Sequence, residues 1–395
     1  MTHAGSAAVD TEEVGHERRR VVVLGPPGGI RPSTWSGIPQ HMVGALRDRH
    51  AEVTVVAAPH TMTTTVGKIR DRVYRKLLGR GRAYAHDIRL AKSWGRSIAR
   101  RIPAGTDFVV APAGSTHLAF LDCSVPVIYT ADTTFALLSG YYPEFSSLTD
   151  RYLDEANEIE QRAIDRAEVL AYPSRWAADS ALQDYGADAS RVHVIPYGAN
   201  LSRVPDSVEI ANAKTEARCE LIFLGVDWKR KGGPLAYETT AILRERGIDA
   251  KLTIVGCNPD LDSGADSWID IIPYVDKSAP EGSELLQTLL LRSSFLLLPT
   301  RRECFGIVFC EASAHGTPSL ATDTGGVAGA VNDGENGYLL GIDTPAEGYA
   351  DLVQDLHADR PRYRSLVRTS RSAYEERLNW PAWASAASTV IESVL

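Results

Sequence analysis

Short apolar runs alternate with longer polar stretches through most of the chain. The runs at residues 20–24, 220–225 and 294–299 are continuous, which is typical of strands in a parallel sheet covered on both faces. Residues 38–49 instead have the pattern of an α-helix, with a proline tolerated in the first turn. Because this strand–helix alternation occupies both halves of the chain, it predicts two doubly wound α/β domains that face a cleft.

A polar, aperiodic stretch at residues 201–218 separates the two halves, and we interpret it as the connection between the domains. We therefore expect one Rossmann-like domain at residues 20–200 and a second at residues 219–379. Residues 380–395 are expected to form a C-terminal helix. Residues 1–19 lack the charged-then-apolar order of a signal peptide, and we predict a disordered tail there.

The composition is that of a globular protein larger than one ordinary domain, with 395 residues of which 44% are hydrophobic. The net charge of −8 argues against nucleic acid as a partner. The five cysteines are odd in number and lack paired spacing, which argues for a reducing compartment and against a disulfide framework or a zinc site. No apolar run approaches membrane-spanning length. These features predict a cytoplasmic protein.

Residues 61–101 are conspicuously basic and contain few acidic residues. One interpretation is a docking surface for an anionic acceptor, with weak contact to lipid headgroups at a membrane surface. The other is a pair of helices whose charges face water. We prefer the second, because charge runs usually face solvent.

Two glutamates, Glu303 and Glu311, stand eight positions apart behind the predicted strand at residues 294–299. Five residues of the segment between them are candidates for contact with a ligand: Phe305, Gly306, Ile307, Val308 and Phe309. A helix that opens near Gly306 points free N–H groups and a positive dipole end at its surroundings. Glycine also allows an anion to approach closely. The arrangement predicts that a phosphate group binds between the two carboxylates. The carboxylates could then bind the hydroxyl groups of a sugar on one side and of a ribose on the other.

The sequence ECFGIVFCEASAHGTPSLATDTGG resembles the donor-site signature of the retaining glycosyltransferases of family 4, which have the GT-B fold. The resemblance implies that Glu311 holds the ribose hydroxyls and that Glu303 contacts the transferred sugar. It also implies that the first domain binds the acceptor, that the second binds the donor, and that the last helix crosses back to the first domain. Taken alone, either glutamate could equally be a solvated surface charge.

The resemblance extends to the loop after the first strand, where Ser36-Gly37 stands in place of the Gly-Gly pair of the family. By resemblance, Gly37 would face the donor diphosphate and Ser36 would add a hydroxyl donor. Alternatively, Gly37 is a loop glycine that is needed only for the conformation of the turn. Asp132 occupies the position where the family commonly has a histidine near the reacting sugar carbon. It could bind a sugar hydroxyl or orient an acceptor, or it could be a helix N-cap without a chemical role.

Two further loops complete the predicted site by resemblance. Arg230 and Lys231 are expected to meet the donor diphosphate, and Tyr274 and Val275 to frame the nucleobase. No Asp-x-Asp motif is placed at a strand end, so we expect no metal and no other cofactor. The charge of the leaving group would then be met by Arg230, Lys231 and the N–H groups near residues 306–309.

The resulting hypothesis is a retaining, metal-independent glycosyltransferase that moves a sugar from a UDP-sugar or GDP-sugar to a small-molecule acceptor, in a specialised-metabolite pathway as our first choice. A lipid-phosphate or polysaccharide acceptor stays open, because the basic residues 61–101 would suit it. A GT-B epimerase or hydrolase of nucleotide sugars, and a non-catalytic sugar-binding protein, are the alternatives from other classes. The sequence indicates neither the oligomeric state nor the nucleobase.

Overall fold

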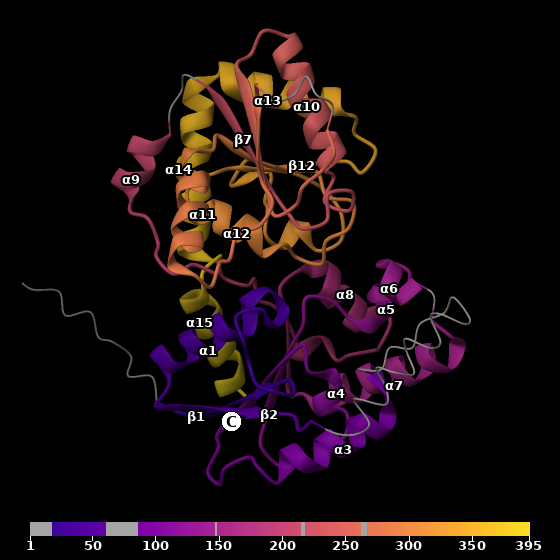
Figure 1. Cartoon of the computed structure of the whole chain (residues 1–395). Helices are drawn as coiled ribbons and strands as arrows, with labels where there is room; N and C mark the ends of the chain where they lie inside the picture. The colour runs from indigo at the N-terminus through magenta and orange to yellow at the C-terminus, as the bar shows by residue number, and fades with distance from the viewer. Residues whose placement is uncertain (1–17, 61–85, 147, 215–217, 262–266) are drawn as a thin grey trace, which may run out of the picture.

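The chain folds into two α/β domains that lie one above the other in Figure 1. The computed structural model describes residues 18–60, 86–146, 148–214, 218–261 and 267–395. Most of the predicted tail and of the basic stretch therefore lies outside the described residues. Within them, no helix has both the length and the apolar character needed to cross a bilayer.

The first domain is built on a six-stranded parallel sheet in the order β2-β1-β3-β4-β5-β6. Strand β1 lies inside the sheet, paired with β2 on one side and with β3 on the other. Its apolar run is buried on both faces, as the continuous hydrophobic pattern predicts. The strands are β1 (Arg20–Gly25), β2 (Glu52–Ala57), β3 (Phe108–Pro112), β4 (Val127–Thr130), β5 (Val169–Tyr172) and β6 (Val192–Val194).

Helices cover both faces of this sheet (Figure 1). Local capping fixes where several of them begin: the Ser174 side chain accepts from the N–H of Ala177, and Asp87 accepts from two N–H groups of the next helix. The described helices are η1 (Thr34–Gly37), α1 (Ile38–Arg49), α3 (Ile88–Ala99), α4 (Ser115–Leu118), α5 (Phe135–Leu138), α6 (Pro143–Ser146), α7 (Asp150–Arg166), α8 (Arg175–Gln183) and η3 (Ala189–Arg191). On α3, the one helix described within the basic stretch, Lys92 and Arg96 face solvent.

The second domain repeats the design with a parallel sheet in the order β12-β11-β10-β7-β8-β9. Its strands are β7 (Cys219–Leu224), β8 (Ala250–Val255), β9 (Ile269–Ile272), β10 (Phe295–Leu298), β11 (Ser319–Thr322) and β12 (Gly337–Leu340). Its helices are α10 (Gly233–Glu245), α11 (Pro280–Arg292), α12 (Ile307–Ala314), η4 (Val327–Gly329), α13 (Ala346–Ala358) and α14 (Arg360–Glu376). The carboxyl ends of β7, β9 and β10 lead into the loops that carry the predicted donor residues.

The chain crosses between the domains twice (Figure 1). The first crossing, which we expected to be irregular, contains the short helix α9 (Ser207–Ala213), which opens with a capping box formed by Asp206 and Glu209. The second crossing is α15 (Trp380–Glu392), which packs on α1. Just after α1, a ring nitrogen of His50 lies 2.9 Å from Ser388 Oγ. The second crossing therefore brings the last helix of the chain against the first α-helix of the N-terminal domain.

Candidate functional site between the domains

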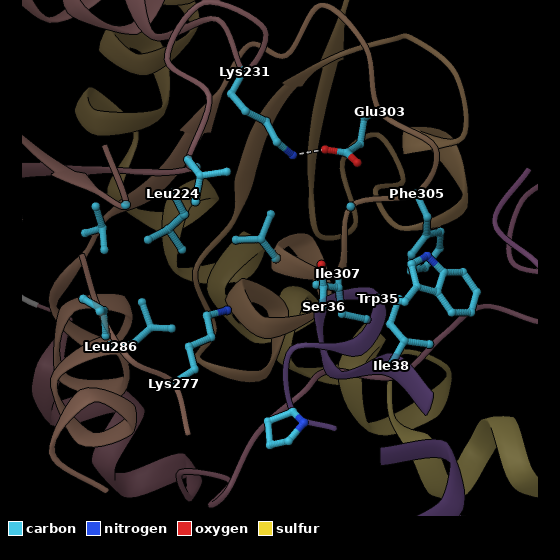
Figure 2. A pocket seen from close by; sticks show the side chains of 18 of the residues that line it. Trp35, Ser36, Ile38, Leu224, Lys231, Lys277, Leu286, Glu303, Phe305 and Ile307 are labelled. Carbon is cyan, nitrogen blue, oxygen red and sulfur yellow. Dashed lines mark hydrogen bonds and ion pairs between the residues drawn. The ribbon is translucent and has the colours of Figure 1, made fainter. Parts of the chain in front are cut away.

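A cavity of about 430 Å³ opens between the two domains, within the size range of small-molecule sites. Loops from both domains line it, and Figure 2 shows their side chains pointing toward a common space. Most of the predicted site residues lie on its wall: Ser36, Asp132, Lys231, Tyr274, Val275, Glu303, Phe305, Gly306, Ile307 and Val308.

The loop after β10 places Glu303 and opens α12 at the cavity. Gly306 is the N-cap of α12 and has a φ of 86°, the left-handed region that favours glycine. A Cβ atom there would lie 2.5 Å from the ring of Phe309 and 3.2 Å from the side chain of Glu303. Gly306 therefore lets the first turn of α12 reach the cavity, where its N–H groups can meet an anion. Phe309 itself is fully buried in the core and does not line the cavity.

Lys231 and Glu303 form an ion pair across the upper wall of the cavity, as Figure 2 shows. Their side chains are only 13% and 12% exposed, so both charges are largely sheltered from water. The lysine stem packs over Gly225 at the end of β7, where an added Cβ would lie 2.9 Å from the Lys231 side chain. The two predicted loops therefore meet, and each charged group has its partner in the other loop.

Arg230 does not line this cavity, although the sequence predicts it as the second cation of the diphosphate site. Its guanidinium donates to the carbonyl oxygen of Arg302 at 3.0 Å and lies 3.6 Å from a carboxylate oxygen of Asp227. It also lies 5.5 Å from the ring centroid of Tyr142, which belongs to the first domain. Arg230 thus takes part in the contact between the domains.

Lys277, which the sequence analysis overlooked, lines the cavity instead. Its Nζ lies 3.0 Å and 2.8 Å from the two carboxylate oxygens of Glu311. Glu311 is 1% exposed and stands behind the lysine. Although the sequence predicts that Glu311 binds the donor, it does not line the cavity. In Figure 2 Lys277 and Lys231 extend into the cavity from opposite sides. The signal that could have revealed Lys277 is its place after β9, because the carboxyl ends of these strands share one edge.

The turn before α1 closes the cavity from the first domain. Trp35, Ser36 and Gly37 have φ values of 43°, 55° and 85°, so two residues with side chains adopt the left-handed conformation. Such strain persists only where the surroundings enforce it, and it gathers at functional sites. The carbonyl oxygen of Ser36 accepts from the Asn200 side chain at 2.7 Å. Gly37 faces a neighbouring cavity of about 760 Å³ rather than this one.

Asp132 lines the cavity and accepts a hydrogen bond from the indole N–H of Trp35 at 3.3 Å. Burial raises the pKa of Asp132 to about 7, and the nearby charge of Glu303 acts in the same direction. The alternative that Asp132 is a helix N-cap is wrong, because the cap of α5 is Thr134, whose side chain accepts from the N–H of Leu137. Asp132 is therefore a sheltered acid on the cavity wall, with the Trp35 indole as its hydrogen-bond donor.

The opposite end of the cavity is apolar, with Leu224, Val255 and Leu286 on its wall beside Val275. Tyr274 also lines the cavity, with 75% of its surface exposed. A flat aromatic base fits such a slot. Within the described ranges, no cluster of three or more His, Cys, Asp or Glu side chains has the arrangement of a metal site.

Comparison with known proteins adds independent findings. Residues 40–203 match the family model described as Glycosyltransferase Family 4, and residues 218–359 match the model described as Glycosyl transferases group 1. A similar curated protein is the D-inositol 3-phosphate glycosyltransferase of Paenarthrobacter aurescens, 28% identical over 271 residues that make up 65% of this chain and 64% of that protein. The chain spans slightly less than two thirds of the length of the first curated relatives it matches.

Solved structures resemble the whole described architecture. Anabaena HepE in complex with UDP has a TM-score of 0.64 at 13% identity, over 95% of this chain and all of that one. Sucrose-phosphate synthase from Thermosynechococcus elongatus has a TM-score of 0.62 at 16% identity, over 95% of this chain and 99% of that one. At these identities the likeness concerns the fold, and the prediction of a two-domain GT-B architecture is confirmed.

Proposed function

Because this chain belongs to glycosyltransferase family 4, we propose that it is a glycosyltransferase whose donor is a nucleotide-diphosphate sugar. The observation that carries the proposal is the approach of Lys231 and Lys277 from opposite sides of one cavity, beside the N-terminus of α12 (Figure 2). Two ammonium groups and a helix N-terminus suit a diphosphate, because they supply positive charge and N–H donors to its oxygens.

The nucleotide would lie along the cavity from its apolar end to Glu303. Tyr274 and Val275 would frame the base, which we propose to be that of UDP or GDP. The ribose would meet the Lys277–Glu311 pair rather than Glu311 alone, because the carboxylate stands behind the lysine. The transferred sugar would then reach Glu303, whose charge Lys231 already balances.

The proposed reaction breaks the bond between the sugar C1 and the diphosphate oxygen and forms a bond from C1 to the acceptor oxygen on the same face. Configuration at C1 is thus retained without a protein nucleophile. Negative charge grows on the departing diphosphate, where Lys231, Lys277 and the N–H groups of α12 would stabilise it without a metal ion. The proton of the acceptor hydroxyl would pass to the departing phosphate oxygen or to the carboxylate of Asp132.

We propose a small hydroxylated acceptor, bound on the side of the first domain. The curated relatives are named D-inositol 3-phosphate glycosyltransferases, which makes a small phosphorylated polyol a reasonable first acceptor to test. A lipid-phosphate or polysaccharide acceptor remains the second choice. The basic residues that would favour it lie mostly outside the described part of the chain.

The first test is thermal stabilisation by UDP, GDP, ADP and TDP, each in the presence of EDTA. A nucleotide at one hundred times its dissociation constant adds about 2.7 kcal/mol to the free energy of unfolding, which raises the melting temperature measurably. We expect one of the four to stabilise the protein. Absence of any shift at millimolar concentration would remove the proposed donor site.

The second test separates a transferase from an epimerase or hydrolase. The protein is incubated with the UDP-sugar or GDP-sugar selected by the first test, with and without a panel of small polyol acceptors. A transferase releases nucleotide only slowly until an acceptor is added. Rapid and complete donor consumption without an acceptor would favour the epimerase or hydrolase.

A further inference from the structure

The first domain also contacts the second through side chains that belong to neither chain crossing. The segment between α5 and α6 reaches the loops that follow β10 and β11 in the second domain. There the hydroxyl of Tyr141 lies 2.9 Å from the backbone nitrogen of Glu303 and 3.2 Å from the hydroxyl oxygen of Thr324. A side chain of one domain thus bonds the main chain of the glutamate that faces the reacting sugar in the proposed function.

The hydrogen bonds at Tyr141 have a definite direction. The N–H of Glu303 can only donate, so the tyrosine oxygen accepts it. The single phenolic hydrogen is then left for Thr324 Oγ1 or for the carbonyl oxygen of Glu303, which lies 3.4 Å away. That carbonyl also accepts the N–H of Gly326 at 3.1 Å. The peptide groups on both sides of the Glu303 Cα atom are therefore held, one by each domain.

The close approach at this contact requires glycine on the loop after β11. A Cβ atom on Gly325 would lie 2.1 Å from the carbonyl oxygen of Glu303 and 2.5 Å from the Tyr141 hydroxyl. A Cβ atom on Gly326 would lie 2.7 Å from the hydroxyl of Ser174, which belongs to the first domain. Any side chain here would force the loop and the first domain apart, so the glycines allow the domains to meet.

The neighbouring tyrosine extends the same contact to the second cationic loop. The ring of Tyr142 lies under the guanidinium of Arg230, and its hydroxyl lies 3.6 Å from Cys304 Sγ. Arg230 precedes Lys231 in the chain, and Cys304 follows Glu303. The contact therefore touches the residue adjacent to each member of the Lys231–Glu303 pair, while the pair itself stays on the cavity wall.

We infer that Tyr141 is a positioning residue that couples the docking of the first domain to the placement of Glu303. When the domains are together, the Tyr141 hydroxyl holds the Glu303 backbone and so sets the carboxylate against Lys231. When they separate, the Glu303 N–H loses its partner and the loop is held by the second domain alone. The inference rests on the proposed function, because it assumes that Glu303 acts on the bound donor.

The kinetic test compares Tyr141→Phe with Tyr185→Phe. The first removes the interdomain hydroxyl but keeps the ring contact with Trp176, whose centroid lies 5.3 Å away within the first domain. The matched control removes a hydroxyl that bonds the Ala136 N–H at 2.9 Å and the Asn157 side chain at 2.6 Å, also within that domain. We expect kcat to fall about tenfold in Tyr141→Phe with the donor KM changed less than twofold, and to stay near wild type in the control.

A second measurement needs no catalysis. Hydrogen–deuterium exchange of the peptide that covers residues 300–306 is compared in the wild type and both variants. Tyr141→Phe should speed exchange there severalfold, because the Glu303 N–H loses its acceptor, and Tyr185→Phe should not. Unchanged exchange in Tyr141→Phe, or a kcat loss equal in the two variants, would overturn the inference. If the wild-type protein transfers no sugar, that result would count against the proposed function. The hydrogen–deuterium exchange result would still test the Tyr141 contact.

Discussion

The two glutamates of the E-x7-E motif each pair with a lysine, yet one glutamate reaches the cavity and the other does not. In the Lys231–Glu303 pair the two side chains are about equally sheltered, at 13% and 12% exposed, and both line the cavity. In the Lys277–Glu311 pair the lysine is 52% exposed and lines the cavity, while the glutamate is 1% exposed behind it. The same residue types therefore give one pair that offers both a carboxylate and an ammonium to a ligand, and one that offers an ammonium alone.

The difference follows from where each glutamate sits. Glu303 lies in a loop before α12, so its side chain can turn toward the opening between the domains. Glu311 lies inside α12, on a helix whose neighbouring residues are buried on all sides. A carboxylate in such a place needs a partner, because an isolated buried charge is costly. Lys277 supplies that partner and in doing so becomes part of the ligand-facing wall.

The largest effect is expected from the pair that faces the sugar. Lys231→Ala should lower kcat about 10²–10³-fold, because it removes a cation from the departing diphosphate and leaves Glu303 without its counter-charge. Steady-state kinetics with the matched control Lys229→Ala, an exposed lysine two residues earlier, checks this. Equal losses of kcat in both variants would mean that the rate depends on the overall positive charge of this loop and not on the lysine that lines the cavity.

The buried pair should respond more in stability than in rate. Lys277→Ala leaves the buried carboxylate of Glu311 uncompensated, and we expect it to lower the free energy of unfolding by about 3 kcal/mol. Adding Glu311→Gln to that variant removes the stranded charge and should restore part of the loss. Urea denaturation of the two single variants and the double variant measures this coupling. Strict additivity would show that the two side chains do not depend on each other.

Nucleotide affinity distinguishes Arg230, the cation that the sequence predicts, from Lys277, the cation that lines the cavity. Lys277→Ala should weaken binding of the nucleoside diphosphate about tenfold and binding of the nucleoside much less, since the ammonium acts on phosphate charge. Arg230→Ala should change either affinity less than twofold, because its guanidinium points to Arg302 and Tyr142. Isothermal titration calorimetry gives both values, and a larger effect at Arg230 would reverse the assignment.

The elements around these pairs could be predicted from the sequence because their signals are local. The glycine at position 306 and the apolar run before Glu303 fix the strand, loop and helix opening within a few residues. The parallel topology then brings the loops after β7 and β10 to one edge, so the meeting of Lys231 with Glu303 follows from the fold.

The side-chain directions within those loops could not be predicted in the same way. Lys277 is 34 residues away from Glu311 in sequence, and only the tertiary structure shows that its stem reaches the buried carboxylate. Arg230 and Lys231 are adjacent, yet one turns to the first domain and the other to the cavity. The left-handed turn at Trp35 and Ser36 depends on contacts with distant residues, such as Asp132 and Asn200.

The smallest expected effect concerns a third carboxylate of the site, which has no lysine partner. Asp132 has a pKa raised to about 7 by burial, so it gains its charge near neutral pH. If the charged form receives the acceptor proton, kcat should rise severalfold as the pH increases through about 7, and Asp132→Asn should flatten that rise. Glu160 is the control: burial raises its pKa to about 7 as well, but it bonds Tyr129 inside the first domain.

Stability and activity should separate these two acids. The ordinary pKa is 3.8 for Asp132 and 4.5 for Glu160, and in the folded protein each pKa is about 7. Between these two pKa values, the folded state binds more protons than the unfolded state. The free energy of unfolding therefore falls as the pH rises through that window. Asp132→Asn and Glu160→Gln should each reduce this slope, but only the first should alter the pH profile of kcat. A profile changed equally by Glu160→Gln would trace the pH dependence to folding and leave Asp132 without a role in proton transfer.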